Sequence, residues 1–286
     1  MNAIMQRIAP RQQDIGFIVR RLLPVRGCRH IGPFVFLDHM GPAYFVAAGT
    51  EGDVRPHPHI GLATVTYLTQ GAMMHRDSLG TVQRIEPGAV NLMVAGRGIV
   101  HSERIPPDIR DSQLAVEGLQ MWLALPLADE ACAPAFYHYA ADELPQAQLP
   151  RALLRLLIGN AYGMHSPVRT FSDTLYLDWQ LQGGGELLLP AAAERGLYLF
   201  DGEVRIGDET VRAGELVQLG AGDIQLHASA CAHGVLFGGA PLDAPRFLDW
   251  NFVASDKARL QQAREDWAAG RFAMVPGETE FIPLPG

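Results

Sequence analysis

Short stretches of β-branched and aromatic residues, separated by turn residues, recur along most of the chain. They predict strands over residues 63–68, 89–94 and 119–125, and again over 174–181, 186–189, 196–200, 203–206, 210–211 and 215–219. The dipeptides at 201–202 (Asp-Gly) and 207–208 (Gly-Asp) lie between such stretches and predict hairpin turns. Short strands at this spacing favour an all-β sandwich or barrel in each half of the chain.

One segment near the C-terminus has a helical pattern instead. Leu260, Ala263 and Trp267 recur at the spacing of one helix face, Ser255 is a suitable N-cap, and Gly270 is a typical stop. We expect a short helix here whose apolar side packs against the body of the protein.

Between residues 126 and 150 the composition changes to alanine, proline and acidic residues, and four prolines interrupt any long regular element. We interpret this segment as the crossover between two β domains of similar design. The predicted domains are residues 1–130 and 131–286, with the C-terminal helix in the second.

Composition and charge narrow the function classes. Hydrophobic residues make up 48% of the chain and charged residues 19%, as in globular proteins. The net charge is −8, from 23 basic and 31 acidic residues, and no basic run occurs, so direct nucleic-acid binding is disfavoured. No apolar stretch is long enough to span a membrane, and no secretory signal is evident. Three widely spaced cysteines favour the reducing cytoplasm.

Four residues in the first half carry the candidate chemistry: His57, His59, His101 and Glu103. In a strand, residues i and i+2 project from the same face, so neighbouring strands could bring these four side chains to one point. One His-x-His pair alone is weak evidence, because exposed histidines are common. Together with the second pair it gives three imidazoles and one carboxylate, a ligand set that suits Fe(II), Mn(II), Ni(II), Cu(II) or Zn(II). Four protein ligands on an octahedral ion leave two positions open for chemistry.

Three further segments are less specific. Residues 75–77 (His-Arg-Asp) precede a Ser-Leu-Gly turn and could either orient the metal ligands or form a hydrogen-bond network at a hairpin end. His39 is a candidate for the mouth of a substrate pocket. Residues 96–98 (Gly-Arg-Gly) are not followed by a helix, so we expect them to form the bend that delivers His101 rather than a phosphate loop.

Long motifs add a family resemblance to these arguments. The chain is similar to the pirin family of the cupin superfamily, and the similarity extends over nearly the whole chain. It rests on residues 57–71 (HPHIGLATVTYLTQG), 75–80 (HRDSLG), 95–103 (AGRGIVHSE), 32–42 (GPFVFLDHMGP) and 118–122 (GLQMW), with weaker matches at 249–253, 269–272 and 280–285.

The resemblance implies a bicupin: two facing antiparallel β-barrels, each a double-stranded β-helix, with one iron in the N-terminal barrel. The family's metal ligands correspond to His57, His59, His101 and Glu103, all four of which are present. Relatives commonly have glutamate at the position of Ala63, so the alanine is expected to change the surroundings of the metal but not to abolish its binding.

The second half contains no His-x-His motif. Its His227 and His233 lie six residues apart, which does not make them neighbours on one strand face. We therefore expect the C-terminal barrel to be metal-free.

For function, the resemblance implies a metal-dependent dioxygenase, most readily an Fe(II) enzyme, that acts with dioxygen on a flavonol such as quercetin. Glu103 is the expected catalytic residue, as ligand and proton acceptor. The alternative is an iron-containing, redox-sensitive regulator that acts through a protein partner. A third possibility is an enzyme whose substrate is unrelated to flavonols, since a shared fold is weak evidence for substrate.

Overall fold

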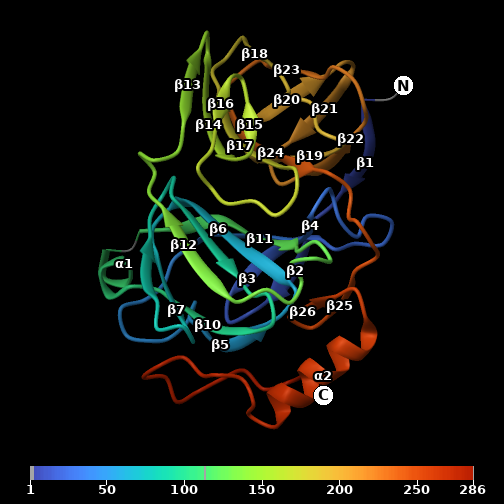
Figure 1. Ribbon diagram of the computed structural model, residues 1–286. Coiled ribbons are helices and arrows are strands. Elements are labelled where there is room, and N and C mark those ends of the chain that lie inside the picture. Colours follow the sequence, from blue (N-terminus) through green and yellow to red (C-terminus); the bar gives the residue numbers. More distant parts are fainter. Residues whose placement is uncertain (1–2, 113, 286) are drawn as a thin grey trace. The chain divides into compact units, whose positions relative to one another are not determined.

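The computed structural model describes residues 3–112 and 114–285, which form 26 strands and two helices (Figure 1). Strands take up 51% and helices 6% of the chain, which confirms the all-β prediction. Among the described residues, no helix is long and apolar enough to cross a bilayer.

The chain folds as two compact units, and each is built from segments that are separated in sequence. Unit 1 consists of Met1–Arg11, Leu22–Val35 and Asp142–Pro241, and unit 2 of Gln12–Arg21, Phe36–Ala141 and Leu242–Gly286. A single boundary after residue 130 therefore does not describe these units. Strand β12 (Ala135–Tyr139) pairs with β9 (Val90–Val94), which keeps residues beyond 130 in unit 2.

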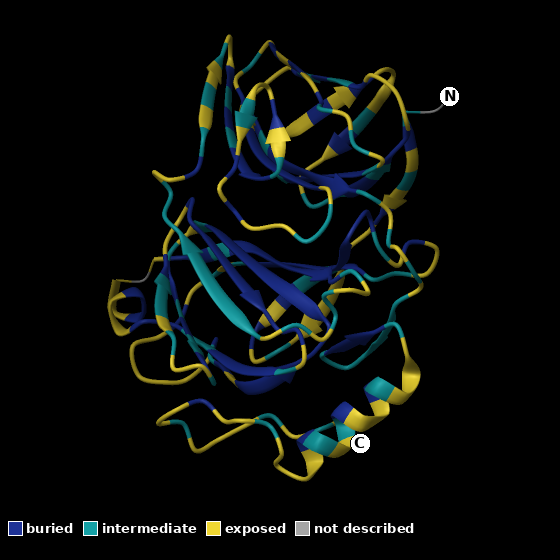
Figure 2. Ribbon diagram, in the orientation of Figure 1, coloured by how far each residue is buried: buried dark blue, intermediate teal, exposed yellow. Residues whose placement is uncertain are grey.

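Unit 2 contains a seven-stranded and a four-stranded antiparallel sheet. The first has the order β12, β9, β6 (Leu62–Gln70), β11 (Val116–Ala124), β4 (Phe34–Ala43), β3 (Ile18–Leu23) and β2 (Arg11–Asp14). The second has the order β5 (Val54–His59), β10 (Ile99–Arg104), β7 (Met73–Asp77) and β8 (Val82–Ile85). Strands β6 and β11 are buried over most of their length (Figure 2), as their continuous apolar and β-branched sequences require.

The C-terminal segment also belongs to unit 2, contrary to the predicted domain 131–286. Its hairpin of β25 (Phe247–Asp249) and β26 (Phe252–Ala254) precedes helix α2 (Lys257–Ala268), and a short helix α1 (Pro107–Ser112) follows β10. The apolar side of α2 packs in one cluster with Ile60, which directly follows β5, and with Val100 of β10. The C-terminus thus belongs with the histidine-containing barrel because its apolar side chains are buried there.

Helix α2 has the predicted buried residues but a different N-cap. Leu260, Ala263 and Trp267 are buried, whereas Asp256, not Ser255, caps the helix by accepting a hydrogen bond from the backbone N–H of Ala258. The hydroxyl of Ser255 instead donates to the carboxylate of Glu130. Because the side chain of Ser255 bonds to the distant Glu130, the neighbouring Asp256 caps the helix instead.

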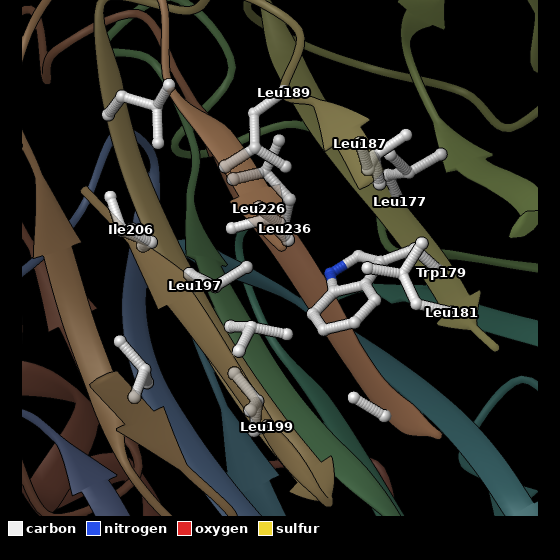
Figure 3. Packing of buried hydrophobic residues seen from close by; sticks show 14 of the residues in the cluster. Leu177, Trp179, Leu181, Leu187, Leu189, Leu197, Leu199, Ile206, Leu226 and Leu236 are labelled. Carbon is white, nitrogen blue, oxygen red and sulfur yellow. The ribbon is translucent and has the colours of Figure 1, made fainter. Parts of the chain in front are cut away.

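Unit 1 repeats the two-sheet design. Its larger sheet has the order β1 (Ile4–Ile8), β22 (Leu216–Leu219), β19 (Glu194–Asp201), β24 (Ala232–Gly239), β17 (Thr174–Leu181), β14 (Ala152–Ile158) and β13 (Gln146–Leu149). The smaller has β18 (Gly185–Leu188), β23 (Gln225–Ala228), β20 (Glu203–Ile206) and β21 (Glu209–Arg212), and β15 (Asn160–Ala161) pairs with β16 (Met164–His165). Trp179 and leucines of several strands pack together as its core (Figure 3).

One of the two predicted hairpin turns is confirmed. Residues 207–208 join β20 to β21, and Ile206 pairs with Glu209 across the turn. The turn prediction at 201–202 is wrong, because β19 and β20 belong to different sheets and the chain crosses from one to the other there. Gly202 has a positive φ of 75°, and a Cβ atom on it would lie 2.3 Å from the carbonyl oxygen of Cys231. The glycine therefore serves close backbone packing at this crossing.

Candidate metal centre

Three histidines of unit 2 meet inside the barrel. Strands β5 and β10 are antiparallel neighbours with His57 opposite His101, and alternation places His59 on the same face as His57. The ring centroids of His57 and His101 are 4.3 Å apart, and that of His59 lies 5.0 Å from each. One nitrogen from each ring lies within 4.8 Å of the others. The structure thus brings three of the four predicted ligand residues together.

The turn at residues 96–98 delivers β10 to this position, as predicted. The N–H of Gly98 donates to the carbonyl of Ala95 at 2.9 Å, and the N–H of Arg97 donates to the carbonyl of Cys132. A Cβ atom on Gly96, which has a φ of 51°, would lie 2.2 Å from that Cys132 oxygen. Only glycine fits this close approach.

Backbone carbonyls orient two of the three rings. The Nδ1 atom of His57 lies 2.8 Å from the carbonyl oxygen of Arg55, and Nδ1 of His59 lies 2.9 Å from the carbonyl oxygen of Asn251. A carbonyl only accepts, so each Nδ1 carries the proton and each Nε2 keeps its lone pair. These are the tautomers in which Nε2 can bind a metal.

The third ring has a buried atom without a partner. His101 is 1% exposed, and its Nε2 has no hydrogen-bond partner. Leaving such an atom unsatisfied costs about 1–3 kcal/mol. A metal ion bound by the three imidazoles would satisfy it, so the residues present fit a divalent transition metal.

The three imidazoles are neutral in the folded protein. Burial lowers the pKa of His57 to about 4, only partly offset by its bond to Arg55. Burial, together with neighbouring histidines, lowers the pKa of His59 and His101 well below the ordinary value. Because only a neutral imidazole binds a metal, the site is ready for an ion at neutral pH.

Glu103 lies outside the three-histidine cluster. It is two residues beyond His101 in a regularly paired stretch against β7, which places it on the same face of β10. Against β5 the register shifts between these two residues. Glu103 therefore lies opposite Val54, which is three residues from His57 and not two as in regular pairing. Burial raises the pKa of Glu103 to about 7. A nearby cation is what would stabilise its charged form.

Aromatic rings from the opposite sheet face the histidines. The Trp122 ring on β11 lies edge-on to His59 at 5.0 Å, and Phe36 on β4 stacks on Trp122 at 3.9 Å. Phe136 on β12 stacks on His75 at 4.4 Å. These aromatic residues were not identified from the sequence as part of the site, because their common face depends on a register between distant strands.

Polar side chains continue this same face. Thr66 donates to Gln120 at 2.8 Å, and Asn91 Oδ1 lies 2.7 Å from His138 Nδ1. Thr66 lies opposite Gln120 on β11 and opposite Asn91 on β9. Thr64, two residues earlier on β6, lies opposite Trp122, so all of these side chains are on one face of the sheet. The buried amide nitrogen of Asn91 has no partner. In the sequence, this polar part of the face is visible as polar residues at alternate positions of otherwise apolar strands.

His39 does not belong to this face. It alternates on β4 with Phe36 and Asp38, and it contacts Arg20 and Glu117 instead. Its expected position at a pocket mouth is therefore wrong, since pairing with these charged groups holds it on the other side of the sheet.

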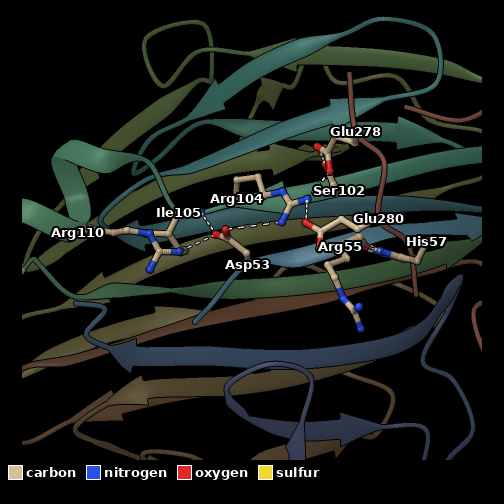
Figure 4. A network of polar contacts seen from close by, with 9 residues as sticks. All are labelled: Asp53, Arg55, His57, Ser102, Arg104, Ile105, Arg110, Glu278 and Glu280. Carbon is tan, nitrogen blue, oxygen red and sulfur yellow. Dashed lines mark hydrogen bonds and ion pairs between the residues drawn. The ribbon is translucent and has the colours of Figure 1, made fainter. Parts of the chain in front are cut away.

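The C-terminal segment supports the reverse side of the ligand strands (Figure 4). Ser102 and Arg104, which alternate with His101 and Glu103, both donate to the carboxylate of Glu278. The N–H of Ile282 donates at 2.8 Å to the carbonyl of Pro56, which precedes His57. The segment that supplies the Asn251 carbonyl to His59 thus also holds both ligand strands from behind.

Asp53 ties the same two strands together at their ends (Figure 4). It directly precedes β5, and one of its oxygens accepts the N–H of Ile105 at 2.8 Å, just after β10. The same oxygen accepts a hydrogen bond from Arg110 on α1 at 2.7 Å, and the other lies 3.7 Å from Arg104.

The histidines of unit 1 have other partners. His227 on β23 pairs with Glu186 at 3.0 Å, and His233 on β24 pairs with Asp178 at 2.9 Å. They lie on different strands, in keeping with their separation in sequence.

Comparison with known proteins places these observations in a family. The Pirin family profile matches residues 16–123, and the profile named Pirin C-terminal cupin domain matches residues 176–273. The chain belongs to the pirin family. A pirin-like protein of Caulobacter vibrioides is 43% identical, over 96% of this chain and 97% of its own length.

Solved structures agree with this assignment. The crystal structure of quercetin 2,3-dioxygenase from Acinetobacter baumannii is 34% identical to this pirin, covers 99% of this chain and 95% of its own, and superposes with a TM-score of 0.91. A bacterial pirin from Escherichia coli in complex with nickel(II) is 18% identical, covers 83% and 99% of the two chains, and has a TM-score of 0.64. This second likeness shows the shared fold. The bicupin prediction is confirmed.

The side chain of Ala63 is directed away from the histidines. Thr64 pairs with Trp122, whose ring contacts His59, so Thr64 is on the metal-facing side of β6 and Ala63 is on the other side. The expectation that Ala63 changes the surroundings of the metal is therefore wrong, because its side chain is directed away from the histidines.

Proposed function

We propose that this pirin is a metal-dependent dioxygenase that acts on a flavonol such as quercetin or on a related enolisable aromatic compound. The observation that supports this proposal most directly is the buried cluster of His57, His59 and His101, with the unpartnered Nε2 of His101. The name of the structurally similar Acinetobacter enzyme supports the substrate class.

The metal would be held by the three imidazoles, with the carboxylate of Glu103 as fourth ligand. Fe(II) is our first choice, and Mn(II), Ni(II), Cu(II) and Zn(II) suit the same donor set. When bound, such an ion would supply Lewis acidity toward an oxygen of the substrate and would promote the reaction with dioxygen. A dication with one carboxylate carries a net charge of about +1, which favours an anionic oxygen such as that of an ionised flavonol hydroxyl.

The facing sheet would bind the organic substrate. Trp122, Phe36 and Phe136 provide aromatic surface for a flat ring system, and the amide nitrogen of Asn91 is a buried donor for a substrate oxygen. Glu103 would take up the proton from the substrate hydroxyl, as the one carboxylate among the four proposed ligands.

The test uses purified protein stripped of metal and reloaded anaerobically with one ion at a time. On admission of air, we expect the absorbance of quercetin to fall with matching uptake of dioxygen in the Fe(II) protein. His59→Ala should abolish this, whereas His227→Ala in unit 1 should not. Absence of turnover with every one of the five ions would overturn the proposal, and a metal-loaded but inactive protein would redirect attention to regulation through a protein partner.

A further inference from the structure

His75 and Asp77 of β7 face the metal centre from its second side. Strand β7 pairs with β10 so that Asp77 lies opposite His101 and His75 opposite Glu103. Both are buried, Asp77 completely. Alternation along β7 places Arg76 on the other side. Of the three residues 75–77, His75 and Asp77 therefore lie on the face of the histidine cluster, and His75 contacts His101.

A chain of polar contacts runs from Asp77 to the unpartnered atom of His101. Oδ2 of Asp77 lies 3.1 Å from Nε2 of His75, and Nδ1 of His75 lies 3.4 Å from Nδ1 of His101. At the far side of the ring, Nε2 of His101 has no partner. Unlike the other two ligand rings, which bond to backbone carbonyls, His101 is oriented by a side chain.

The direction of these hydrogen bonds follows from the chemistry of the groups. An ionised carboxylate only accepts, so His75 carries a proton on Nε2, toward Asp77. In that tautomer Nδ1 of His75 has a lone pair and accepts the Nδ1 proton of His101. His101 is left with its lone pair on Nε2, the atom that faces the other imidazoles.

Other contacts fix the two residues in place. Oδ1 of Asp77 accepts the backbone N–H groups of Leu79 at 2.9 Å and Thr81 at 3.0 Å, which closes the hairpin end. The ring of His75 is stacked on Phe136. The two oxygens of Asp77 thus have separate partners, one in the turn and one in His75, and the hairpin-end network predicted from the sequence is present.

We infer that Asp77 and His75 are positioning residues that hold His101 in the tautomer required for metal binding. This inference rests on the proposed function in so far as His101 is a ligand. We call the hydrogen-bonded chain Asp77–His75–His101 the relay. It determines which nitrogen of His101 faces the metal.

Asp77→Asn tests the relay with little change in shape. The amide oxygen can still accept the N–H groups of Leu79 and Thr81, but an N–H₂ group replaces the oxygen that faces His75. His75 must then accept at Nε2 and donate from Nδ1, which moves the proton of His101 to Nε2. We expect the affinity for Ni(II), measured by competition with a coloured chelator, to fall by about 10–100-fold.

The matched control is Asp178→Asn in unit 1. Asp178 makes the same kind of contact with His233, at 2.9 Å, but no metal ligand follows. This variant should bind Ni(II) as the unmodified protein does. An equal loss in both variants, or no loss in Asp77→Asn, would overturn the inference.

A readout independent of metal separates this inference from the proposed function. In the metal-free protein, ¹⁵N NMR of the histidine rings should show His101 protonated at Nδ1, and at Nε2 in Asp77→Asn. Observation of the Nε2–H form in the unmodified protein overturns the relay, even if the Asn variant fails to fold. If the unmodified protein binds no metal at all, the proposed function fails while the tautomer measurement still decides the relay.

Discussion

Loss of the partly buried Asp53 carboxylate is expected to destabilise unit 2, because it leaves the buried Arg110 without its partner. Asp53→Ala removes the acceptor of Arg110, whose side chain is 6% exposed, and of the Ile105 N–H. Removal of one partner from a buried ion pair costs about 3–5 kcal/mol, because the other charge is left uncompensated. For domains of this size, 1 kcal/mol shifts Tm by about 2–4 °C, so the transition of unit 2 should fall by about 6–20 °C.

Calorimetry of the metal-free protein measures this shift, with Asp108→Ala as the control. Asp108 makes a two-bond ion pair with Arg84 on the surface, where water replaces the lost interaction. Its variant should unfold close to the unmodified protein. In the double variant Asp53→Ala, Arg110→Met the buried charge is gone, so part of the loss should be recovered. A shift for Asp53→Ala no larger than that for Asp108→Ala would refute this argument.

Three further outcomes are expected. The pKa of His57 falls from 6.5 in the unfolded chain to about 4 on folding, so acidification from pH 6.5 to 4 protonates the unfolded state first and removes about 3 kcal/mol of stability. Glu103, with its raised pKa, acts in the opposite direction, so the comparison is made as urea unfolding of unmodified protein and His57→Phe at pH 4.5 and 7.5; an equal loss in both would contradict the assignment. Glu278→Ala, which frees Ser102 and Arg104, should lower the Tm of unit 2 more than Glu280→Ala at an exposed site, and the reverse order would count against the support role. Asn91→Leu should raise the KM for quercetin about fivefold, the value of one hydrogen bond, with Ni(II) affinity unchanged; an unchanged KM would remove Asn91 from the substrate site.

The histidine cluster could be predicted from the sequence because the motifs that contain its residues are short, local segments. The alternation of His57 with His59 needs only the period of a strand, and the motif around His101 supplies the second strand. The terminal helix was likewise visible from its apolar spacing, but its cap was not, because Ser255 is taken by the distant Glu130.

The surroundings of the cluster depend on long-range register, which one sequence does not contain. The face shared by Trp122, Phe36 and Asn91 follows from the pairing of β4, β6, β9 and β11. The same register shows that Ala63 faces away from the metal. The membership of residues 242–286 in unit 2 depends on where α2 buries its apolar side, against Ile60 and Val100, which lie at least 160 residues earlier in the chain.

The most direct test of the metal centre is the number of ions per chain, measured by native mass spectrometry and elemental analysis after loading with Fe(II) under anaerobic conditions. The account predicts one ion per chain in the unmodified protein and in His227→Ala, and almost none in His59→Ala or His101→Ala. Equal metal content in all four proteins, or none in the unmodified protein, would contradict it.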